Sequence, residues 1–197
     1  MIITETRVRD AYRITPEPIP DHRGSLYESL RYETLRRATG HAIEIRQVNH
    51  TVNRRNTLRG IHGTTVPPGQ GKIVTCVRGA ARTMVVDLRV GSPTFGGHDV
   101  VGQDAESGVA VYLPDGLGLG YVALADDTCM NYLYTREYTP GMIIDIDALD
   151  PGLGLPWNLT EPPVRSERDA AAPSLAEAAA AGTLPGYEQC LRAYPAM

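Results

Sequence analysis

Two side chains that can move or hold a proton, His62 and Lys72, stand ten residues apart in the chain, each beside a glycine and near the start of a predicted strand. In a barrel, such positions could bring both side chains into one interior. Tyr132 and Tyr134 lie on the same face of another predicted strand, because side chains alternate along a strand. A histidine base, a tyrosine acid and a lysine together suit proton exchange next to a carbonyl group.

Each of these residues also has a plainer interpretation. A histidine in this setting is more often a hydrogen-bonded structural residue than a catalytic one, and paired tyrosines are typical of a half-buried aromatic strand. Lys72 is the one lysine among 19 basic residues, so a coding bias toward arginine could have left it by accident. The residue types alone do not decide between the two interpretations.

A metal site is the next possibility, because jelly-roll barrels often hold iron or manganese with two histidines and a carboxylate. Such sites usually contain a His-x-His pair with a carboxylate a few residues later. None of the five histidines forms that pair; they are His22, His41, His50, His62 and His98. We therefore expect no metal.

The segment from Gly116 to Gly120 alternates glycine with leucine and superficially resembles a dinucleotide-binding loop. The glycines of such a loop must open a helix whose N-terminus receives the pyrophosphate. Here residues 121–124 follow, and their sequence is typical of a strand. The segment is therefore predicted to be a flexible turn between strands.

Short apolar segments alternate with turn residues along the whole chain, which contains 20 glycines and 15 prolines. Seven segments have the composition of short strands: residues 41–52, 71–77, 83–88, 108–113, 120–124, 130–134 and 142–146. Residues 78–82 predict a hairpin turn. Helices are predicted over residues 30–39, before Gly40, and over the alanine-rich run that a Ser174–Glu177 capping box opens. The pattern indicates a mainly β, jelly-roll barrel with short peripheral helices, forming a single domain over residues 1–197.

Charge and hydropathy exclude several classes of partner. The net charge is −4, whereas nucleic-acid binding needs a dense basic face; the scattered arginines could still hold one small anion. No apolar run approaches the roughly 18 residues of a membrane span, and the N-terminus does not have the pattern of a secretory leader. The three cysteines do not have the spacing of a disulfide framework or a zinc site. We expect a cytoplasmic protein with neither a nucleic-acid nor a membrane partner.

Several blocks of the chain resemble the dTDP-4-dehydrorhamnose 3,5-epimerase family in order and spacing, from about residue 20 to the C-terminal helix. They are Asp21-His22-Arg23-Gly24, Gln47-Val48-Asn49-His50, Leu58-Arg59-Gly60-Ile61-His62, Gln70-Gly71-Lys72, residues 87–96, residues 132–140 and residues 166–173. The resemblance implies a cupin-like jelly-roll barrel, a dTDP-linked sugar nucleotide as substrate, and neither metal nor cofactor. It also implies a homodimer with an exchanged N-terminal strand.

The resemblance implies roles for four catalytic residues. His62 takes the place of the base that removes the proton next to the C4 ketone, and Asp169 that of the carboxylate that orients this histidine. Tyr132 matches the acid that returns a proton from the opposite face. Lys72 matches the cation beside the ketone oxygen, where charge develops.

The resemblance also implies a set of substrate-binding residues. Arg59 matches a contact to the diphosphate, and Arg23, reaching over from the partner subunit, matches another; forked guanidinium donors suit phosphate. Positions around the nucleotide and sugar are matched by Glu28, Gln47, Asn49 and Tyr138.

Three departures from the family pattern cluster on one wall of the expected pocket. Leu119 replaces a histidine, Thr83 stands where an acidic residue is usual, and Gly63 follows His62 in place of an aromatic residue. An apolar side chain at position 119 cannot donate a hydrogen bond to the enolate. The chain is therefore expected to be an epimerase acting at C3, C5 or both, with altered regiochemistry.

Two other hypotheses remain open at this point. The barrel could act on a different ketone substrate without a nucleotide, or it could be a non-catalytic protein that binds sugar nucleotides. Paired arginines in a net-acidic chain favour a retained diphosphate site and speak against the first. Binding without any proton exchange would indicate the second.

Overall fold

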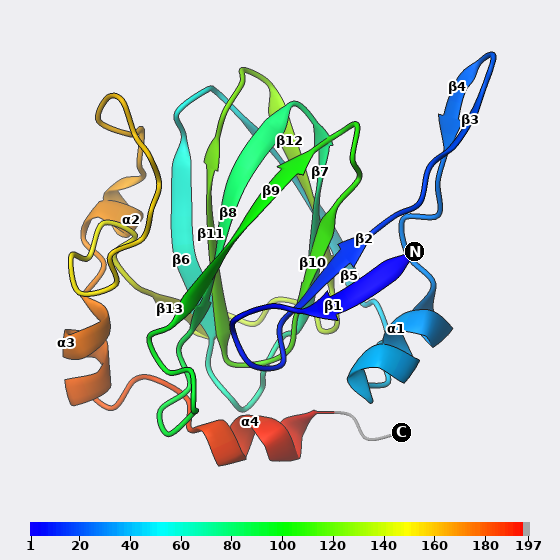
Figure 1. Cartoon of the computed structure of the whole chain (residues 1–197). Coiled ribbons are helices and arrows are strands. Elements are labelled where there is room, and N and C mark those ends of the chain that lie inside the picture. Colours follow the sequence, from blue (N-terminus) through cyan, green and yellow to red (C-terminus); the bar gives the residue numbers. More distant parts are fainter. Residues whose placement is uncertain (195–197) are drawn as a thin grey trace.

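The computed structural model describes residues 1–194, in which the long strands form two antiparallel sheets packed face to face (Figure 1). The first sheet has the strand order β1 (Ile2–Glu5), β2 (Tyr12–Thr15), β10 (Ala110–Leu113), β7 (Lys72–Arg78), β12 (Thr128–Tyr134) and β5 (Gln47–Asn53). The second has the order β13 (Ile143–Asp145), β6 (Leu58–Thr64), β11 (Leu117–Ala123), β8 (Ala80–Asp87) and β9 (His98–Asp104). This arrangement confirms the mainly β, jelly-roll prediction, although no ladder in residues 1–194 closes the two sheets into one barrel.

All seven predicted strand segments contain a strand, but the prediction missed several others. β6, β9, the N-terminal strands β1 and β2, and the small hairpin of β3 (Ile19–Asp21) and β4 (Gly24–Leu26) were not expected. β6 has two glycines, an arginine and a histidine in seven residues. It is extended because β11 pairs with it on one side and β13 on the other, which is long-range information that local composition does not contain.

Two turn predictions were wrong. Residues 78–82 do not form a hairpin, because β7 and β8 belong to different sheets; Gly79, with φ 74°, lets the chain pass sharply from one sheet to the other. The glycine-rich run is not a flexible turn either, since Leu117 to Gly120 lies inside the fully buried strand β11. A Cβ on Gly118 would come within 2.5 Å of Ile61, so these glycines permit close packing within the core.

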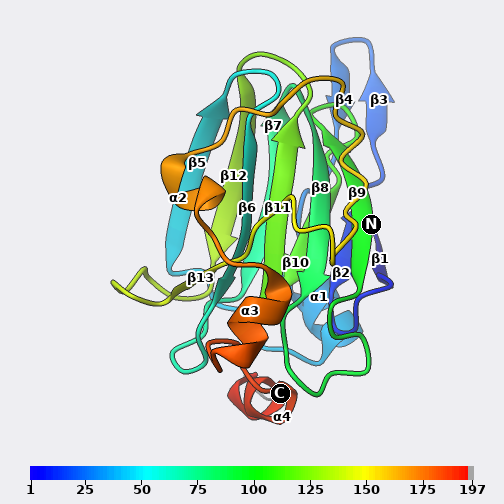
Figure 2. The ribbon, with the colours of Figure 1, turned by 90° about the vertical axis from the view of Figure 1, so that its left-hand side faces the viewer.

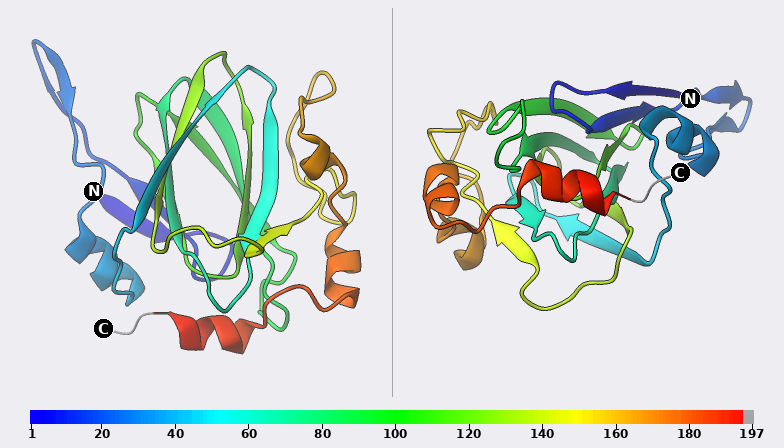
Figure 3. Two further views of the ribbon diagram at one scale, coloured as in Figure 1. Left: turned by 180° about the vertical axis from the view of Figure 1, so that it is seen from behind. Right: turned by 90° about the horizontal axis from the view of Figure 1, so that it is seen from below.

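The helices lie outside the sheets, as predicted. α1 (Tyr32–Thr39) ends at Gly40, and α3 (Leu175–Ala180) begins with the capping box of Ser174 and Glu177. Two further short helices, α2 (Glu167–Ala170) and α4 (Tyr187–Ala193), were not predicted. α2 and α3 lie over the outer face of the second sheet (Figure 2), and α4 crosses one end of the molecule (Figure 3). No helix within residues 1–194 is long and apolar enough to cross a membrane.

Apolar side chains fill two layers on either side of the second sheet. The first layer lies between the sheets and includes Val74, Val85, Met130 and Tyr121. The second lies under α3 and the segment before α2, and Trp157 is its largest member. Burial of this layer fixes the segment that carries α2, and so positions the one helix that contributes to the site described below.

Arg89, buried completely, ties the connection between β1 and β2 and the end of α4 to the second sheet. Its guanidinium forms ion pairs at 2.8 Å with Asp87 and Asp10, and donates to the hydroxyl of Tyr194 at 2.7 Å. Burial alone would raise the pKa of Asp87, but the hydrogen bonds and charge of Arg89 lower it overall. The pair therefore remains charged inside the protein.

Replacing Arg89 with methionine is expected to destabilise the fold by about 3–5 kcal/mol, because it leaves the buried Asp87 charge without its partner. Urea unfolding at neutral pH measures the change. Arg78, which is exposed and donates to a backbone carbonyl, offers a control, and its replacement by methionine is expected to cost under about 1 kcal/mol. Equal losses in both variants would contradict the structural role of Arg89.

Candidate active site

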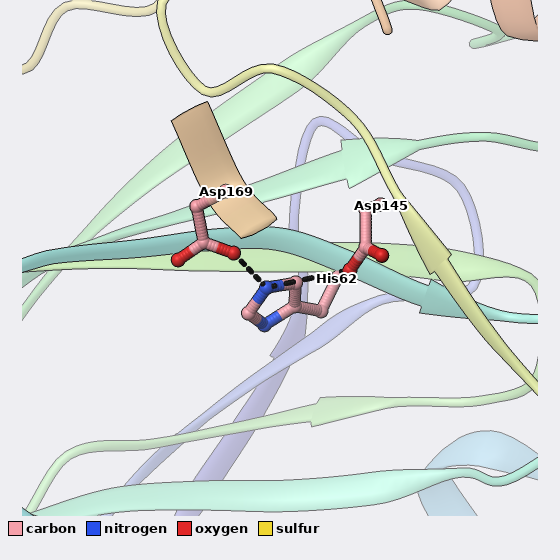
Figure 4. Close-up of side chains that lie close together, drawn as sticks. All are labelled: His62, Asp145 and Asp169. Atoms are coloured by element: carbon pink, nitrogen blue, oxygen red, sulfur yellow. Dashed lines mark hydrogen bonds and ion pairs between the residues drawn. The ribbon is translucent and has the colours of Figure 1, made fainter. Parts of the chain in front are cut away.

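His62 and Asp169 meet at the face of the second sheet where α2 approaches it (Figure 4). Nε2 of His62, on β6, lies 2.7 Å from Oδ1 of Asp169. The N-cap Ser166 accepts the backbone N–H of Asp169, and Arg165 donates to its carbonyl, so the short helix is held in place at both atoms. The resemblance implied this pair, and the fold brings together two residues that are 107 positions apart.

The electrostatics of this pair leave the imidazole ready to accept a proton. Burial raises the pKa of Asp169, but the hydrogen bond and charge of His62 lower it overall, so the carboxyl is ionised. An ionised carboxylate fixes the proton of His62 on Nε2. Nδ1, on the opposite side of the ring, is then the atom that can take a proton from a substrate.

Asp145 lies on the same side of the imidazole, with its Oδ1 3.6 Å from Nε2 of His62. Asp145, His62 and Asp169 are the group within residues 1–194 that could offer three ligand atoms to a metal. Nε2 is occupied by its hydrogen bond to Asp169, and Arg168 binds the other oxygen of Asp145. This set therefore has the partners of an ion-pair network, and the expected absence of a metal stays a prediction.

Lys72 reaches from the first sheet toward His62 on the second. It is only 7% exposed, and its Nζ donates to the backbone carbonyl of His62 at 3.0 Å. Burial lowers the pKa of Lys72 to about 8. The predicted convergence of the histidine and the lysine is thus present. Among residues 1–194 the ammonium has one hydrogen-bond partner, which leaves two of its three donors for a ligand.

Tyr132 and Tyr134 share the inner face of β12, as alternation predicted, and their rings stack with centroids 5.7 Å apart. Burial raises the pKa of Tyr132 well above its ordinary value, so the phenol stays protonated. The neighbouring hydroxyls of Tyr121 and Thr51 lie 2.8 Å apart. Tyr132 is therefore a protonated phenol beside other hydroxyl groups, on the sheet opposite that of His62.

These side chains line a cavity of about 160 Å³ between the two sheets. Its lining residues are Asn49, Thr51, Arg59, His62, Lys72, Leu119, Tyr121, Tyr132 and Tyr134. A more open cavity of about 380 Å³ shares His62, Lys72, Asn49 and Tyr134 with it, and adds the predicted Gln47 and Tyr138. The two cavities form one cleft around the histidine.

Arg59 enters this cleft through a small polar network. Its Nε donates to Oδ1 of Asn53 at 2.8 Å, and the hydroxyl of Tyr121 donates to the same oxygen at 3.2 Å. This network holds the stem of the guanidinium and leaves its terminal donors for a ligand.

Most of the chain is similar to known proteins. Residues 5–177 match the family described as dTDP-4-dehydrorhamnose 3,5-epimerase. The chain belongs to this epimerase family. It is 47% identical over 174 residues to a dTDP-4-dehydro-6-deoxyglucose 3-epimerase of Streptomyces bikiniensis, covering 87% of this chain and 89% of that protein. It is 42% identical over 190 residues to a dTDP-4-dehydrorhamnose 3,5-epimerase of Mycobacterium tuberculosis, covering 95% and 94%.

A solved structure is similar throughout. It is a double mutant, with one histidine replaced by asparagine and one tyrosine by phenylalanine, of a 3′-monoepimerase from Streptomyces bikiniensis in complex with dTDP. The TM-score is 0.92 at 42% identity, covering 96% of this chain and 95% of that one. The fold prediction from the family resemblance is therefore confirmed.

Two predicted site residues of this epimerase family member lie away from the cleft. Arg23 is in the β3–β4 hairpin, which projects from the molecule (Figure 1), and pairs with Asp21 at 2.6 Å. Glu28, just beyond it, lies 3.7 Å from Arg31. β1 and β2 complete the chain's own first sheet, so it is this hairpin that extends outward. The expected homodimer, with Arg23 acting on a partner, stays a prediction.

The prediction that the three departures from the family pattern cluster on one wall of the pocket is wrong, because Thr83 lies outside the cleft. Leu119, on β11, lies directly opposite His62 and presents an apolar wall to the cavity. Thr83 is buried and donates to Gln103 at 2.7 Å, so it is satisfied inside the sheets and does not line the cleft. Gly63 leaves room for Leu88, since a Cβ there would come within 2.7 Å of it.

Sequence reasoning missed several residues of this epimerase cleft. Thr51 continues the alternation of Gln47 and Asn49 along β5, which could have revealed it. Tyr121 follows the glycine run that was interpreted as a turn. Asp145 could not be found from the sequence, because its position depends on the register between β13 and β6.

Proposed function

We propose that the protein epimerises a dTDP-4-keto-6-deoxyhexose next to its C4 ketone. The observation that carries this proposal is the placement of a histidine base on one sheet and a protonated tyrosine on the other, across one cavity. A base and an acid on opposite faces of a sugar ring invert a carbon, because the proton leaves one face and returns to the other.

The proposed step uses this chain's own residues throughout. Nδ1 of His62 takes the proton from the carbon next to the ketone, and the electron pair moves to the ketone oxygen to form an enolate. Lys72 stabilises that oxygen, while Asp169 stabilises the imidazolium. Tyr132 then gives its proton to the other face of the carbon, and the ketone re-forms.

A dTDP group on the substrate is supported by Arg59, which lines the cleft and is bonded to Asn53 through its Nε. The 3′-monoepimerase that this chain resembles was crystallised with dTDP. Its substituted histidine and tyrosine are 70 residues apart, as are His62 and Tyr132. In the proposed homodimer, Arg23 of the projecting hairpin would bind the diphosphate of the partner subunit's substrate.

We further infer exchange at a single carbon. Leu119 cannot donate a hydrogen bond, so one side of the cavity offers no polar support to an enolate. Relatives of this chain include both a 3-epimerase and a 3,5-epimerase, so the family accommodates either outcome.

Within residues 1–194 all three cysteines are free, which is typical of a reducing compartment and supports a cytoplasmic enzyme.

Incubation with dTDP-4-keto-6-deoxyglucose in D2O is expected to place deuterium at one of C3 and C5 at least about tenfold faster than at the other, a difference of about 1.4 kcal/mol in barrier. NMR resolves the two positions. Leu119→His should speed the slower exchange, whereas Leu119→Met, an apolar control of similar volume, should not. Rapid exchange at both positions in the unmodified protein would refute the single-carbon inference.

Thermal unfolding with dTDP separates this function from the alternatives. A ligand that binds the folded state raises the midpoint temperature. Stabilisation by millimolar dTDP together with exchange supports the epimerase. Exchange-free stabilisation would indicate a non-catalytic binding protein, and no stabilisation would indicate a substrate without the nucleotide.

A further inference from the structure

Asp145 is an unexplained carboxylate beside the proposed base (Figure 4). Its Oδ1 is buried and has no hydrogen-bond partner in the part of the chain that the structure describes. The nearest donor is Nε2 of His62, 3.6 Å away, which also bonds Asp169 at 2.7 Å. A buried carboxylate oxygen without a partner is costly unless a donor or a positive charge faces it.

We propose that Asp145 is a second positioning carboxylate for His62, facing the Nε2 side of the ring beside Asp169 and stabilising, through its charge, the imidazolium that forms when Nδ1 takes a proton. The two carboxylates arrive from independent elements. Asp145 ends β13, directly opposite His62 in the β13–β6 register, and Asp169 comes from α2. Both acids thus lie on the Nε2 side of the imidazole, and Nδ1 lies on the other side of the ring.

Arg168 moderates the charge of Asp145. Its Nε and Nη2 both lie 2.8 Å from Oδ2 of Asp145, the oxygen that points away from His62. The Arg168 side chain is 59% exposed, and such a pair contributes little to stability. Oδ2 of Asp145 therefore contacts the exposed guanidinium of Arg168, and Oδ1 faces the half-buried imidazole of His62.

The other charged and titratable groups near His62 come from every neighbouring element. They are Arg59 on β6, Lys72 on β7, Tyr132 and Tyr134 on β12, and Arg168 and Asp169 on α2. β11 contributes Leu119 and Tyr121 to the cavity. Against this background the two carboxylates are the only anionic groups among the described residues that cluster with the imidazole.

This inference rests on the proposed role of His62, so its test includes a measurement that does not need turnover. The imidazole of His62 is titrated by NMR in the whole protein labelled with ¹³C and ¹⁵N at histidine, with its signal assigned by comparison with His62→Asn. The pH dependence of kcat/KM for deuterium exchange is measured alongside it.

Asp145→Asn removes one anion beside the ring. The midpoint of the His62 titration and the acid limb of kcat/KM should both move to lower pH by about 0.5–1 unit, because the imidazolium loses part of its stabilisation. Exchange at neutral pH should slow about three- to tenfold, since the base is weaker. Arg168→Gln should move the titration the opposite way, and this effect should vanish when Asp145→Asn is also present.

Asp126→Asn is the control. Asp126 is exposed in the turn between β11 and β12, where it accepts a hydrogen bond from the backbone N–H of Arg55, and its carboxylate is not in the cluster around His62. Its replacement should leave the titration in place. An unshifted titration in Asp145→Asn, or the same shift in Asp126→Asn, would overturn the proposal. The two failures can be told apart. If the protein exchanged no deuterium but Asp145→Asn still shifted the His62 titration, the proposed function would be wrong and the role of Asp145 beside His62 would stand.

Discussion

Replacing His62 with asparagine is expected to slow deuterium exchange next to the C4 ketone by about 10²–10⁴-fold, the range that a positioned general base contributes. Asparagine keeps a polar group near Asp169 but has no nitrogen that accepts a proton at neutral pH. The rate is read by NMR in D2O with dTDP-4-keto-6-deoxyglucose. Binding of dTDP, measured by thermal unfolding, should be retained, because Arg59, the proposed diphosphate contact, is held by Asn53 and not by His62.

His98 provides a matched control for this substitution. It lies on β9, at the opposite edge of the second sheet from β6 and β13, and outside the residues that line the cleft. The His98→Asn variant should therefore exchange deuterium into the substrate at the rate of the unsubstituted protein. If His62→Asn also exchanged at that rate, His62 would be the structural histidine of the plainer interpretation, and its hydrogen bond to Asp169 would serve folding alone.

Strands were predictable where local composition matches the sheet that forms. β7, β8 and β12 are rich in valine, tyrosine and other strand formers, and all were expected. β6 was missed although it carries the proposed base. Its glycines and charged residues have weak strand propensity, and its extended form depends on two partners from distant parts of the chain.

The same distinction applies to the site. Lys72 and His62 are close in sequence, and their positions near predicted strand starts indicated that they could converge, although their residue types did not decide whether they are functional. Asp169 was known only through family resemblance, because α2 is a four-residue helix whose position depends on packing of the segment that precedes it. Asp145 depends on a strand register, and a shift of one residue would turn its side chain to the other face.

Lys72→Arg is expected to slow exchange by about 10²–10³-fold, the loss typical of removing one preorganised donor to a developing oxyanion. Arginine keeps the charge, but its broad planar fork cannot occupy the place of a compact ammonium. The space around this side chain is limited, since Lys72 is only 7% exposed and its Nζ is bonded to the carbonyl of His62. Near-normal exchange in this variant would show that Lys72 has no catalytic role, and coding bias would then explain its presence.

The pH dependence of Lys72 gives this role a second test. Because its pKa is about 8 in the folded protein, the ammonium is lost as the pH rises through that value, and kcat/KM should fall on the alkaline side with the same midpoint. The free energy of unfolding should rise with pH over the range in which kcat/KM falls. Between about 8 and the ordinary value of 10.5, the unfolded chain binds a proton that the folded chain does not, so stability rises with pH.

Lys72→Met separates these two effects. Removing the buried amine abolishes the source of this rise in stability, so the variant should be at least as stable as the original protein at neutral pH, with a flatter profile between pH 8 and 10.5. Its exchange should nevertheless be as slow as that of Lys72→Arg or slower, because no donor faces the enolate oxygen. Urea unfolding across this pH range measures the first effect and NMR the second. A lysine that lowers stability and yet is required for exchange is placed there by the chemistry of the site, whereas a methionine variant that loses stability and keeps its exchange rate would assign Lys72 to the fold.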